Sequence, residues 1–315
     1  MMKQEKPLHI WRFTDGKPGH QNQYLGLVEA IKKRVSCLIH EWEIPPSLIQ
    51  RWKWRKDWKA EVNKLPQPHL IIGAGHRTHS MVLRAQRQCG GKSVLLMRPS
   101  LPLSWFDLCV VPQHDQVKLR SNVMQVRGVL NAITASGQQK LSQGLVLIGG
   151  PCRHVDWSDE LVVEQIDRIL KSSPSMQWIL TTSRRTPPSF LKHLADKCHA
   201  ANLTVTPVSE TQSGWVAEKL ACSKQVWATS DSVSMLYESI TSGASTGVLN
   251  VPWTTSGKLR NGLDELIQTK MVTTFSDWNS KQPLPPPSVP LAEAERVADW
   301  ITAQWFAKLQ VQPHL

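Results

Sequence analysis

At 315 residues, with 41% hydrophobic residues, the chain is long enough for two globular domains, and its composition excludes an intrinsically disordered protein. No apolar run approaches the roughly 18 residues that a membrane-spanning helix needs, and the start, MMKQEKPLHIWRF, lacks the apolar stretch of a signal peptide, so we expect an unsecreted protein. Residues 1–138 hold 21 Lys and Arg against 9 Asp and Glu, whereas residues 139–315 hold 16 of each, so the first half is expected to meet an anionic partner: nucleic acid, an acidic glycan or an anionic membrane surface.

The cysteines give no sign of a metal site or of disulfide bonds. The chain has 6 of them, no two form a Cys-x-x-Cys pair, and several lie inside apolar runs such as Leu108-Cys109-Val110. This usage is typical of small core residues in a reducing compartment.

The chain begins with a strand, a polar loop and a helix. Leu8 to Phe13 is the expected strand, and the helix carries an apolar stripe that ends near Val35. Between them Asp15, Lys17 and His20 put a carboxylate, a cation and an imidazole into one glycine-containing loop, which favours acid–base chemistry. The alternative is an ordinary turn with a surface histidine.

Residues 46–65 combine Trp52, Trp54 and Trp58 with several Lys and Arg residues in one segment, which is expected to be a helix or a helix-rich loop. Tryptophan with basic residues is typical of a segment that rests on anionic lipid headgroups. An ordinary amphipathic surface helix explains the pattern equally well.

A second strand, residues 68–75, leads into Gly73-Ala74-Gly75-His76-Arg77-Thr78 and a helix to about Cys89. This resembles the start of a dinucleotide-binding fold, but Thr78 replaces the third glycine. No Asp or Glu lies between Glu61 and Asp107, so the acidic residue that would hold the NAD ribose is missing. The sequence therefore argues against NAD at this loop.

Further strands are expected at residues 93–97, 106–111 and 123–126, each followed by polar residues. In an open parallel sheet, ligands bind at the edge formed by the carboxyl ends of the strands.

After the polar stretch 134–143 the pattern of strands and helices starts again, with strands at 145–148, 178–182, 204–208, 226–228 and 247–250 and helices between them. Residues 282–290, QPLPPPSVP, form a stiff linker, and an amphipathic helix from Leu291 to Leu309 follows. We therefore predict an α/β protein of two Rossmann-like domains, 1–138 (basic, on the acceptor or membrane side) and 139–286 (on the nucleotide-sugar side), with a closing segment 287–315.

The stretch 226–249 carries the clearest binding signal in the second half. An apolar stripe from Val233 to Ile240 predicts a helix, and Ser232 and Ser234 lie at its start, where free N–H groups favour a phosphate. Glu238, one turn later, could hold a ribose diol. The alternative is a capped helix with an exposed glutamate.

Seven motifs in this order resemble the bacterial branch of the mitochondrial fission ELM (elongated mitochondria) family. They are DGKPGHQNQYLGL (15–27), GAGHRTH (73–79), FDLCVVPQHD (106–115), RGVLN (127–131), LIGGP followed by His154 and Trp157, TTSRRTP (181–187) and SDSVSMLYES (230–239). The resemblance covers nearly the whole chain. It implies a fold of the GT-B glycosyltransferase type and a metal-independent, nucleotide-sugar-dependent transferase, although plant members of the family are adaptors in organelle division.

The resemblance also implies roles for individual residues. In the second domain the nucleotide diphosphate would be held by Gly149, Gly150, Ser183, Arg184, Ser232, Ser234 and Glu238. In the first domain His20 or Asp15 would be the catalytic base, and Gly16, Lys17, Gly19, His76 and Arg77 would bind an anionic, lipid-linked or glycan acceptor. No Asp-x-Asp occurs, so no metal site is expected, and the nucleotide sugar is a substrate rather than a cofactor.

Two functions of different classes remain open from the sequence. The first is a cytoplasmic transferase, peripheral on the inner face of the cytoplasmic membrane, for which nucleic acid is an unlikely partner. The second is a non-catalytic adaptor that keeps the fold and binds a membrane or a protein through its basic, Trp-rich face. The sequence favours the transferase, because an adaptor has no need of Glu238, Arg184 and the loop at 15–20 together.

Overall fold

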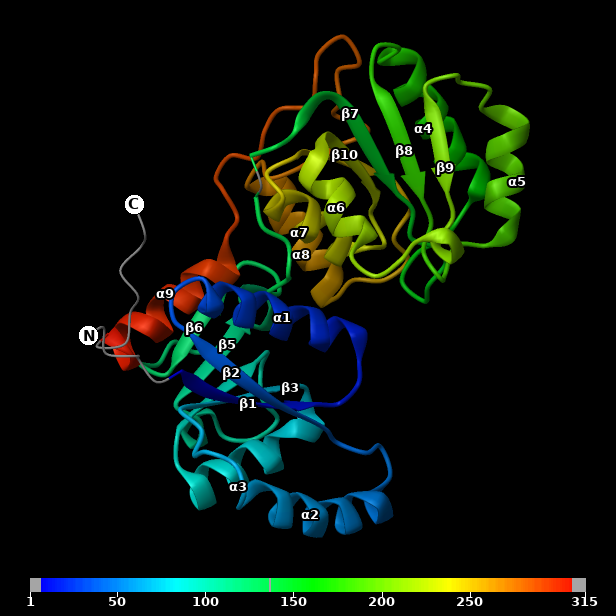
Figure 1. Ribbon diagram of the computed structural model, residues 1–315. Coiled ribbons are helices and arrows are strands. Elements are labelled where there is room, and N and C mark those ends of the chain that lie inside the picture. The colour runs from blue at the N-terminus through cyan, green and yellow to red at the C-terminus, as the bar shows by residue number, and fades with distance from the viewer. Residues whose placement is uncertain (1–6, 136, 308–315) are drawn as a thin grey trace. The chain divides into compact units, whose positions relative to one another are not determined.

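The structure is a computed structural model that describes residues 7–135 and 137–307. The described chain divides into two compact units: residues 7–132 with 292–307 form the first, and the remainder up to Leu291 forms the second. Each unit is a parallel sheet covered by helices on both faces (Figure 1). This confirms the predicted class, an α/β protein of two Rossmann-like domains.

The sheet of the first unit has six strands in the order β2-β1-β3-β4-β5-β6, and every neighbouring pair is parallel. Its strands are β1 (Leu8–Thr14), β2 (Cys37–Glu43), β3 (Leu70–Ala74), β4 (Lys92–Leu96), β5 (Leu108–Pro112) and β6 (Val123–Val126). Its helices are α1 (Pro18–Lys32), α2 (Leu48–Val62), α3 (His79–Cys89) and α9 (Glu293–Trp305). Helices α1 and α9 cover one face, whereas α2 and α3 cover the other (Figure 1).

Alternate residues of β1 supply the two cores of this unit. Leu8 and Ile10 pack with the α1 and α9 side, whereas Trp11 and Phe13 pack with the α2 and α3 side. Because both faces are covered, the strand is almost continuously apolar, as central parallel strands usually are.

Helix α9 returns to the first unit after the proline-rich segment and packs beside α1 (Figure 1). Glu295 pairs with Lys33 at 2.7 Å, and Asp299 pairs with Arg34 at 2.7 Å. The sequence predicted a closing segment of its own, with a helix to Leu309. In the structure the helix ends at Trp305, and positions 308 and 309 lie outside the described residues.

Helix α2 forms where it was predicted, but its three tryptophans do not share one exposed face. Trp58 is 1% exposed and lies among Trp11, Phe13 and Trp42, with ring centroids 5.9–6.4 Å away. Trp52 is 65% exposed, and Lys56 Nζ lies 4.0 Å from its ring centroid. The expectation that Trp58 belongs to an exposed, tryptophan-rich surface is therefore wrong. Packing its indole against these rings removes a large apolar surface from water, and this stabilises the fold more than leaving the indole exposed would.

The sheet of the second unit also has six strands, in the order β12-β11-β10-β7-β8-β9, all parallel. They are β7 (Lys140–Leu147), β8 (Gln177–Thr181), β9 (Leu203–Thr206), β10 (Ser223–Thr229), β11 (Ser245–Leu249) and β12 (Thr273–Thr274). The helices are α4 (Asp159–Ser172), α5 (Pro188–Lys197), α6 (Trp215–Cys222), α7 (Val233–Thr241) and α8 (Lys258–Gln268). Helices α4 and α5 cover one face, and α6, α7 and α8 cover the other.

Two helix starts follow local sequence rules. Ser158 caps α4, because its Oγ accepts a hydrogen bond from the N–H of Leu161 at 3.2 Å. Proline opens α5 at Pro188, where its missing N–H would have no intrahelical partner anyway. All six cysteines are free, and none of the described helices is long and apolar enough to cross a bilayer.

Candidate functional site

The strand order of the first sheet predicts a ligand-binding site at the carboxyl ends of β1 and β3. From β1 the chain goes to β2 on one side, and it then returns to β3 on the other side of β1. Such a reversal of strand order opens a crevice at the carboxyl ends of the two strands, which is where open α/β sheets bind ligands. The loop from Asp15 to His20 follows β1, and the segment from Gly75 to Thr78 follows β3.

Asp15 and His20 form a hydrogen-bonded pair at this position. His20 Nδ1 lies 2.8 Å from Asp15 Oδ1, the aspartate side chain is fully buried, and 16% of the histidine side chain is exposed. A carboxylate can only accept this hydrogen bond, so Nδ1 carries the proton and Nε2 keeps the lone pair. An oriented imidazole with a free Nε2 is suited to accept a proton from a hydroxyl group.

The charge of Asp15 is maintained by its neighbours. Burial alone would raise its pKa, but the hydrogen bond and charge of His20, the backbone N–H of Lys17 and the charge of Arg77 lower the pKa below its ordinary value. Lys17 N donates to Oδ1 at 3.3 Å, and Arg77 Nε lies 3.9 Å from Oδ2. An ionised Asp15 stabilises the imidazolium that forms when His20 takes up a proton.

Gly75 leaves the space that this pair occupies. A Cβ at Gly75 would lie 2.5 Å from Cε1 of His20 and 2.9 Å from Oδ2 of Asp15, and the residue has a φ of +84°. A side chain here would displace the imidazole and strain the backbone. Gly75 belongs to a motif of the sequence but was assigned no role, since nothing in the sequence places it beside His20.

The five residues predicted to bind the acceptor lie on the two segments at this edge. Gly16 has a φ of +75°, and Lys17 and Gly19 are exposed at the start of α1. His76 is exposed, whereas the Arg77 side chain is 17% exposed and lies beside Asp15. The Arg77 cation therefore lies beside Asp15, and the exposed Lys17 directly precedes the helix that carries His20.

The second sheet reverses its strand order between β7 and β10. The chain runs from β7 outward to β8 and β9, and then returns to β10 on the other side of β7. Gly149 and Gly150 follow β7, and Asp231 follows β10, so these residues occupy the crevice position of this sheet.

The two glycines pack against protein atoms. A Cβ at Gly149 would lie 2.2 Å from Oδ2 of Asp231, and one at Gly150 would lie 2.4 Å from the backbone oxygen of Arg185. Gly149 N donates to Thr229 Oγ1 at 2.8 Å, and Gly150 N donates to Asp231 Oδ2 at 3.1 Å. The glycines therefore let the loop after β7 close onto the loop after β10.

Asp231 and Arg185 were missed as site residues by the sequence analysis. Arg185 Nη2 donates to Asp231 Oδ2 at 2.7 Å, and its Nη1 donates to the carbonyl oxygen of Gly150 at 2.7 Å. Ser183 Oγ donates to the carbonyl oxygen of Gly149 at 2.8 Å.

Arg184, which was assigned to the diphosphate, is exposed, and within the described residues it makes no ion pair. Of these two neighbouring arginines, Arg185 is held by Asp231, whereas the Arg184 guanidinium has no ion pair with a described residue.

Helix α7 begins at this same edge. Ser232 is its N-cap residue, is 7% exposed and makes no side-chain cap hydrogen bond, and Ser234 is exposed in the first turn. Glu238 is partly exposed one turn later. The structure thus brings Gly149, Gly150, Ser183, Ser232 and Ser234 to one edge of the second sheet. Within the described residues no group of His, Cys, Asp and Glu could hold a metal ion.

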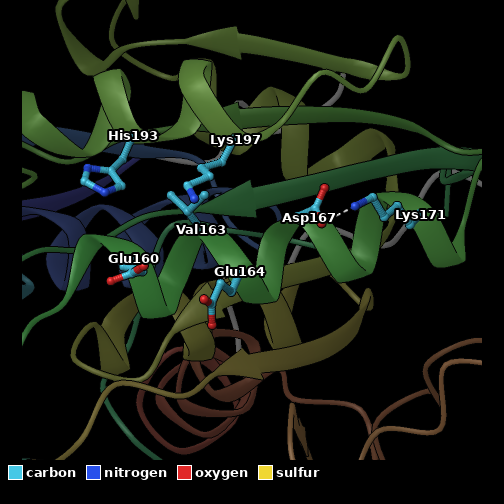
Figure 2. A pocket seen from close by; sticks show the side chains of 7 residues that line it. All are labelled: Glu160, Val163, Glu164, Asp167, Lys171, His193 and Lys197. Carbon is cyan, nitrogen blue, oxygen red and sulfur yellow. Dashed lines mark hydrogen bonds and ion pairs between the residues drawn. The ribbon is translucent and has the colours of Figure 1, made fainter.

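A separate hollow of about 250 Å³ lies between α4 and α5. Figure 2 shows Asp167 paired with Lys171 on α4, and His193 and Lys197 approaching from α5. None of the predicted site residues lines this hollow, so it plays no part in the candidate site.

Comparison with known proteins gives one family and several similar folds. The family described as "Mitochondrial fission ELM1" matches residues 18–305. A relative named "Uncharacterized protein RP120", from Rickettsia prowazekii (strain Madrid E), is 24% identical over 93% of this chain and 98% of its own length.

Among solved structures, the UDP-GlcNAc 2-epimerase from Methanocaldococcus jannaschii is similar with a TM-score of 0.61 and 10% identity, over 94% of this chain and all of that one. MurG from Acinetobacter baumannii is similar with a TM-score of 0.52 and 10% identity, over 95% of this chain and all of that one. At this identity the likeness concerns the fold, which is of the GT-B type.

Proposed function

The chain belongs to the mitochondrial fission ELM1 family, and from this membership and the GT-B fold we propose that it is a metal-independent glycosyltransferase that uses a nucleotide sugar. The observation that carries the proposal is the Asp15–His20 pair, with His20 Nδ1 2.8 Å from Asp15 Oδ1. An adaptor has no need of a buried carboxylate that orients an imidazole at the crevice of a sheet.

The second unit is proposed to bind the donor. The structurally similar epimerase is named for UDP-GlcNAc, which supports a nucleoside diphosphate sugar as the ligand class. The diphosphate would lie at the start of α7, near Gly149, Gly150, Ser183, Ser232 and Ser234. Free N–H groups at a helix start favour such an anion, and Arg184 would offset the charge that the leaving diphosphate gains.

The first unit is proposed to bind the acceptor and to supply the base. His20 Nε2 would take the proton of an acceptor hydroxyl while its oxygen forms a bond to the sugar carbon. The bond from that carbon to the diphosphate oxygen breaks, and the nucleoside diphosphate leaves with the bonding electron pair. Lys17 and Arg77 favour an acceptor that carries a phosphate or carboxylate.

Replacement of Glu238 by Ala tests the donor site. Two hydrogen bonds from a ribose diol to a carboxylate contribute on the order of 1.5 to 3 kcal/mol each before water compensates, so we expect nucleotide affinity to fall more than about tenfold. Isothermal titration calorimetry should measure this, with the nucleotide chosen by a thermal-shift screen of UDP, GDP, CMP and ADP. Glu164→Ala, which removes an exposed carboxylate from α4, is the matched control. Unchanged binding in Glu238→Ala would refute the site.

The adaptor alternative and a peripheral contact with an anionic membrane surface are supported by α2. Its exposed Trp52 and Ile49, which are 65% and 84% exposed, lie among basic residues. Each Lys or Arg near an anionic surface contributes roughly 1 kcal/mol, and salt screens this attraction. We therefore expect salt-sensitive cosedimentation with anionic vesicles, weakened in Trp52→Ala. Equal cosedimentation with neutral and anionic vesicles would contradict a contact with anionic lipid headgroups.

A further inference from the structure

A second hollow of about 250 Å³ lies at the carboxyl edge of the second sheet. It is formed by the segment after β7, with Arg153 and His154, and by the segment after β11, which runs from Trp253 into the first turn of α8. The two segments are joined by an antiparallel bridge between Val155 and Trp253. The hollow thus has a defined frame at the edge where this fold binds ligands.

The lining of this hollow is cationic. Arg153, Lys258 and Arg260 contribute three positive charges, and no carboxylate is among the lining residues. Asp264 offsets one of these charges, because it accepts from Arg260 Nε at 2.8 Å. Arg153 makes no ion pair in the described part of the chain; its Nε donates instead to His154 Nε2 at 3.0 Å. Arg153 therefore keeps an uncompensated positive charge in the hollow, although the second half of the chain has no net charge overall.

Hydrogen bonds in the lining also orient a hydroxyl group. Because Arg153 donates to His154 Nε2, this nitrogen is the acceptor of the imidazole and the proton lies on Nδ1. Nδ1 then donates to Thr255 Oγ1 at 2.9 Å. The hydroxyl proton of Thr255 is consequently directed to another acceptor, and the first turn of α8 beside it has no side-chain cap.

We propose that this pocket binds a phosphate or carboxylate group of a small ligand. Guanidinium, ammonium and hydroxyl donors around one hollow match the oxygen atoms of such a group. The volume lies below the roughly 300–1,000 Å³ of sites that enclose a whole drug-sized ligand, so the pocket takes one part of its ligand. Trp253 lines the same hollow, with the Arg260 guanidinium carbon 5.9 Å from its ring centroid, and gives an apolar surface for a sugar ring next to the charged group.

The anion that the pocket binds can come from two sources. Both belong to a nucleotide-sugar donor, so the choice between them rests on the proposed function. One source is the diphosphate of the nucleotide donor itself. The other is an acidic group on the transferred sugar, such as the carboxylate of a uronic acid. The pocket and its charge do not depend on this choice, so the anion site is tested first without any nucleotide.

The first experiment titrates the full chain with pyrophosphate by calorimetry at constant ionic strength. Arg153→Gln and Lys258→Gln each remove a cation from the pocket. Lys192→Gln is the matched control, because Lys192 is exposed on α5 and lies outside the pocket. We expect saturable binding that weakens about tenfold in each pocket variant and is unchanged in the control. No saturable binding by the wild type, or equal loss in all three variants, would overturn the proposal.

The second experiment compares UDP, UDP-glucose and UDP-glucuronic acid on the wild type and Arg153→Gln. Equal weakening of all three assigns the pocket to the diphosphate, whereas weakening of UDP-glucuronic acid alone assigns it to an acidic sugar. If pyrophosphate binds as expected but Glu238→Ala leaves UDP binding unchanged, the donor site fails and the anion pocket stands. Unchanged binding of all ligands, pyrophosphate included, in Arg153→Gln and Lys258→Gln would refute the pocket.

Discussion

Replacement of His20 by Ala should lower turnover by about 10² to 10⁴-fold while donor binding to the second unit stays nearly unchanged. The reason is the geometry of the pair: Asp15 is buried and accepts from Nδ1, so Nε2 is left as the proton acceptor. A positioned base acts in the transition state, and its loss therefore affects turnover more than ground-state affinity.

The assay is sugar transfer from the nucleotide sugar that the thermal-shift screen selects. Asp15→Asn should also lower turnover, because an amide no longer fixes the imidazole tautomer by accepting alone. His199→Ala, an exposed histidine of the second unit, is the matched control. Full activity in both His20→Ala and Asp15→Asn would move the base elsewhere. A parallel loss of donor affinity would instead mean that His20 acts on binding.

The free energy of unfolding should fall by about 3 kcal/mol as the pH drops from 6.5 to 4, through the titration of His79. Burial, and then the charge of His76, lowers the pKa of His79 from 6.5 to about 4. The unfolded chain therefore binds a proton in this window that the folded chain excludes. The stability is fully present above pH 6.5 and is lost as the pH falls through the folded pKa.

This loss is large beside a typical stability of about 5–15 kcal/mol. Urea denaturation followed by tryptophan fluorescence at about pH 7 and about pH 4.5 measures it. His79→Gln should remove much of the difference between the two pH values, whereas His199→Gln, at an exposed position, should keep it. An unchanged pH dependence in His79→Gln would show that other groups govern acid unfolding. His79 is 4% exposed, with Ser100 Oγ 3.2 Å from its Nδ1, so it is neutral in the folded state near pH 7.

Much of the sheet structure was predictable because central parallel strands are buried on both faces. Val123–Val126 was predicted with the bounds that it has, the predicted 226–228 lies within the longer β10, and the predicted 145–148 overlaps the end of β7. Strand β2 was missed: it is an edge strand whose polar residues interrupt the apolar pattern, and its Leu38 is 51% exposed. The first half of β7, from Lys140 to Gln143, was read as a break in the pattern for the same reason.

The candidate site was predictable only as separate loops. The sequence shows polar residues directly after apolar strands, and parallel topology puts such loops at one edge of each sheet, so Asp15, His20 and Ser232 could be named as candidates. Gly149 was named from the family resemblance. The hydrogen bond between Asp15 and His20 is local, since both lie in one loop and the first turn of a helix.

What the sequence alone determined is therefore the class of fold, the strand ends and the type of chemistry that each loop can carry. Which loops meet was decided by tertiary structure. Gly75 lies against His20 because β3 pairs with β1, and Arg185 rather than Arg184 binds Asp231 because the turn after β8 closes onto Gly150. Strand order and side-chain packing depend on contacts between residues far apart in the chain, and no local pattern of residues encodes those contacts.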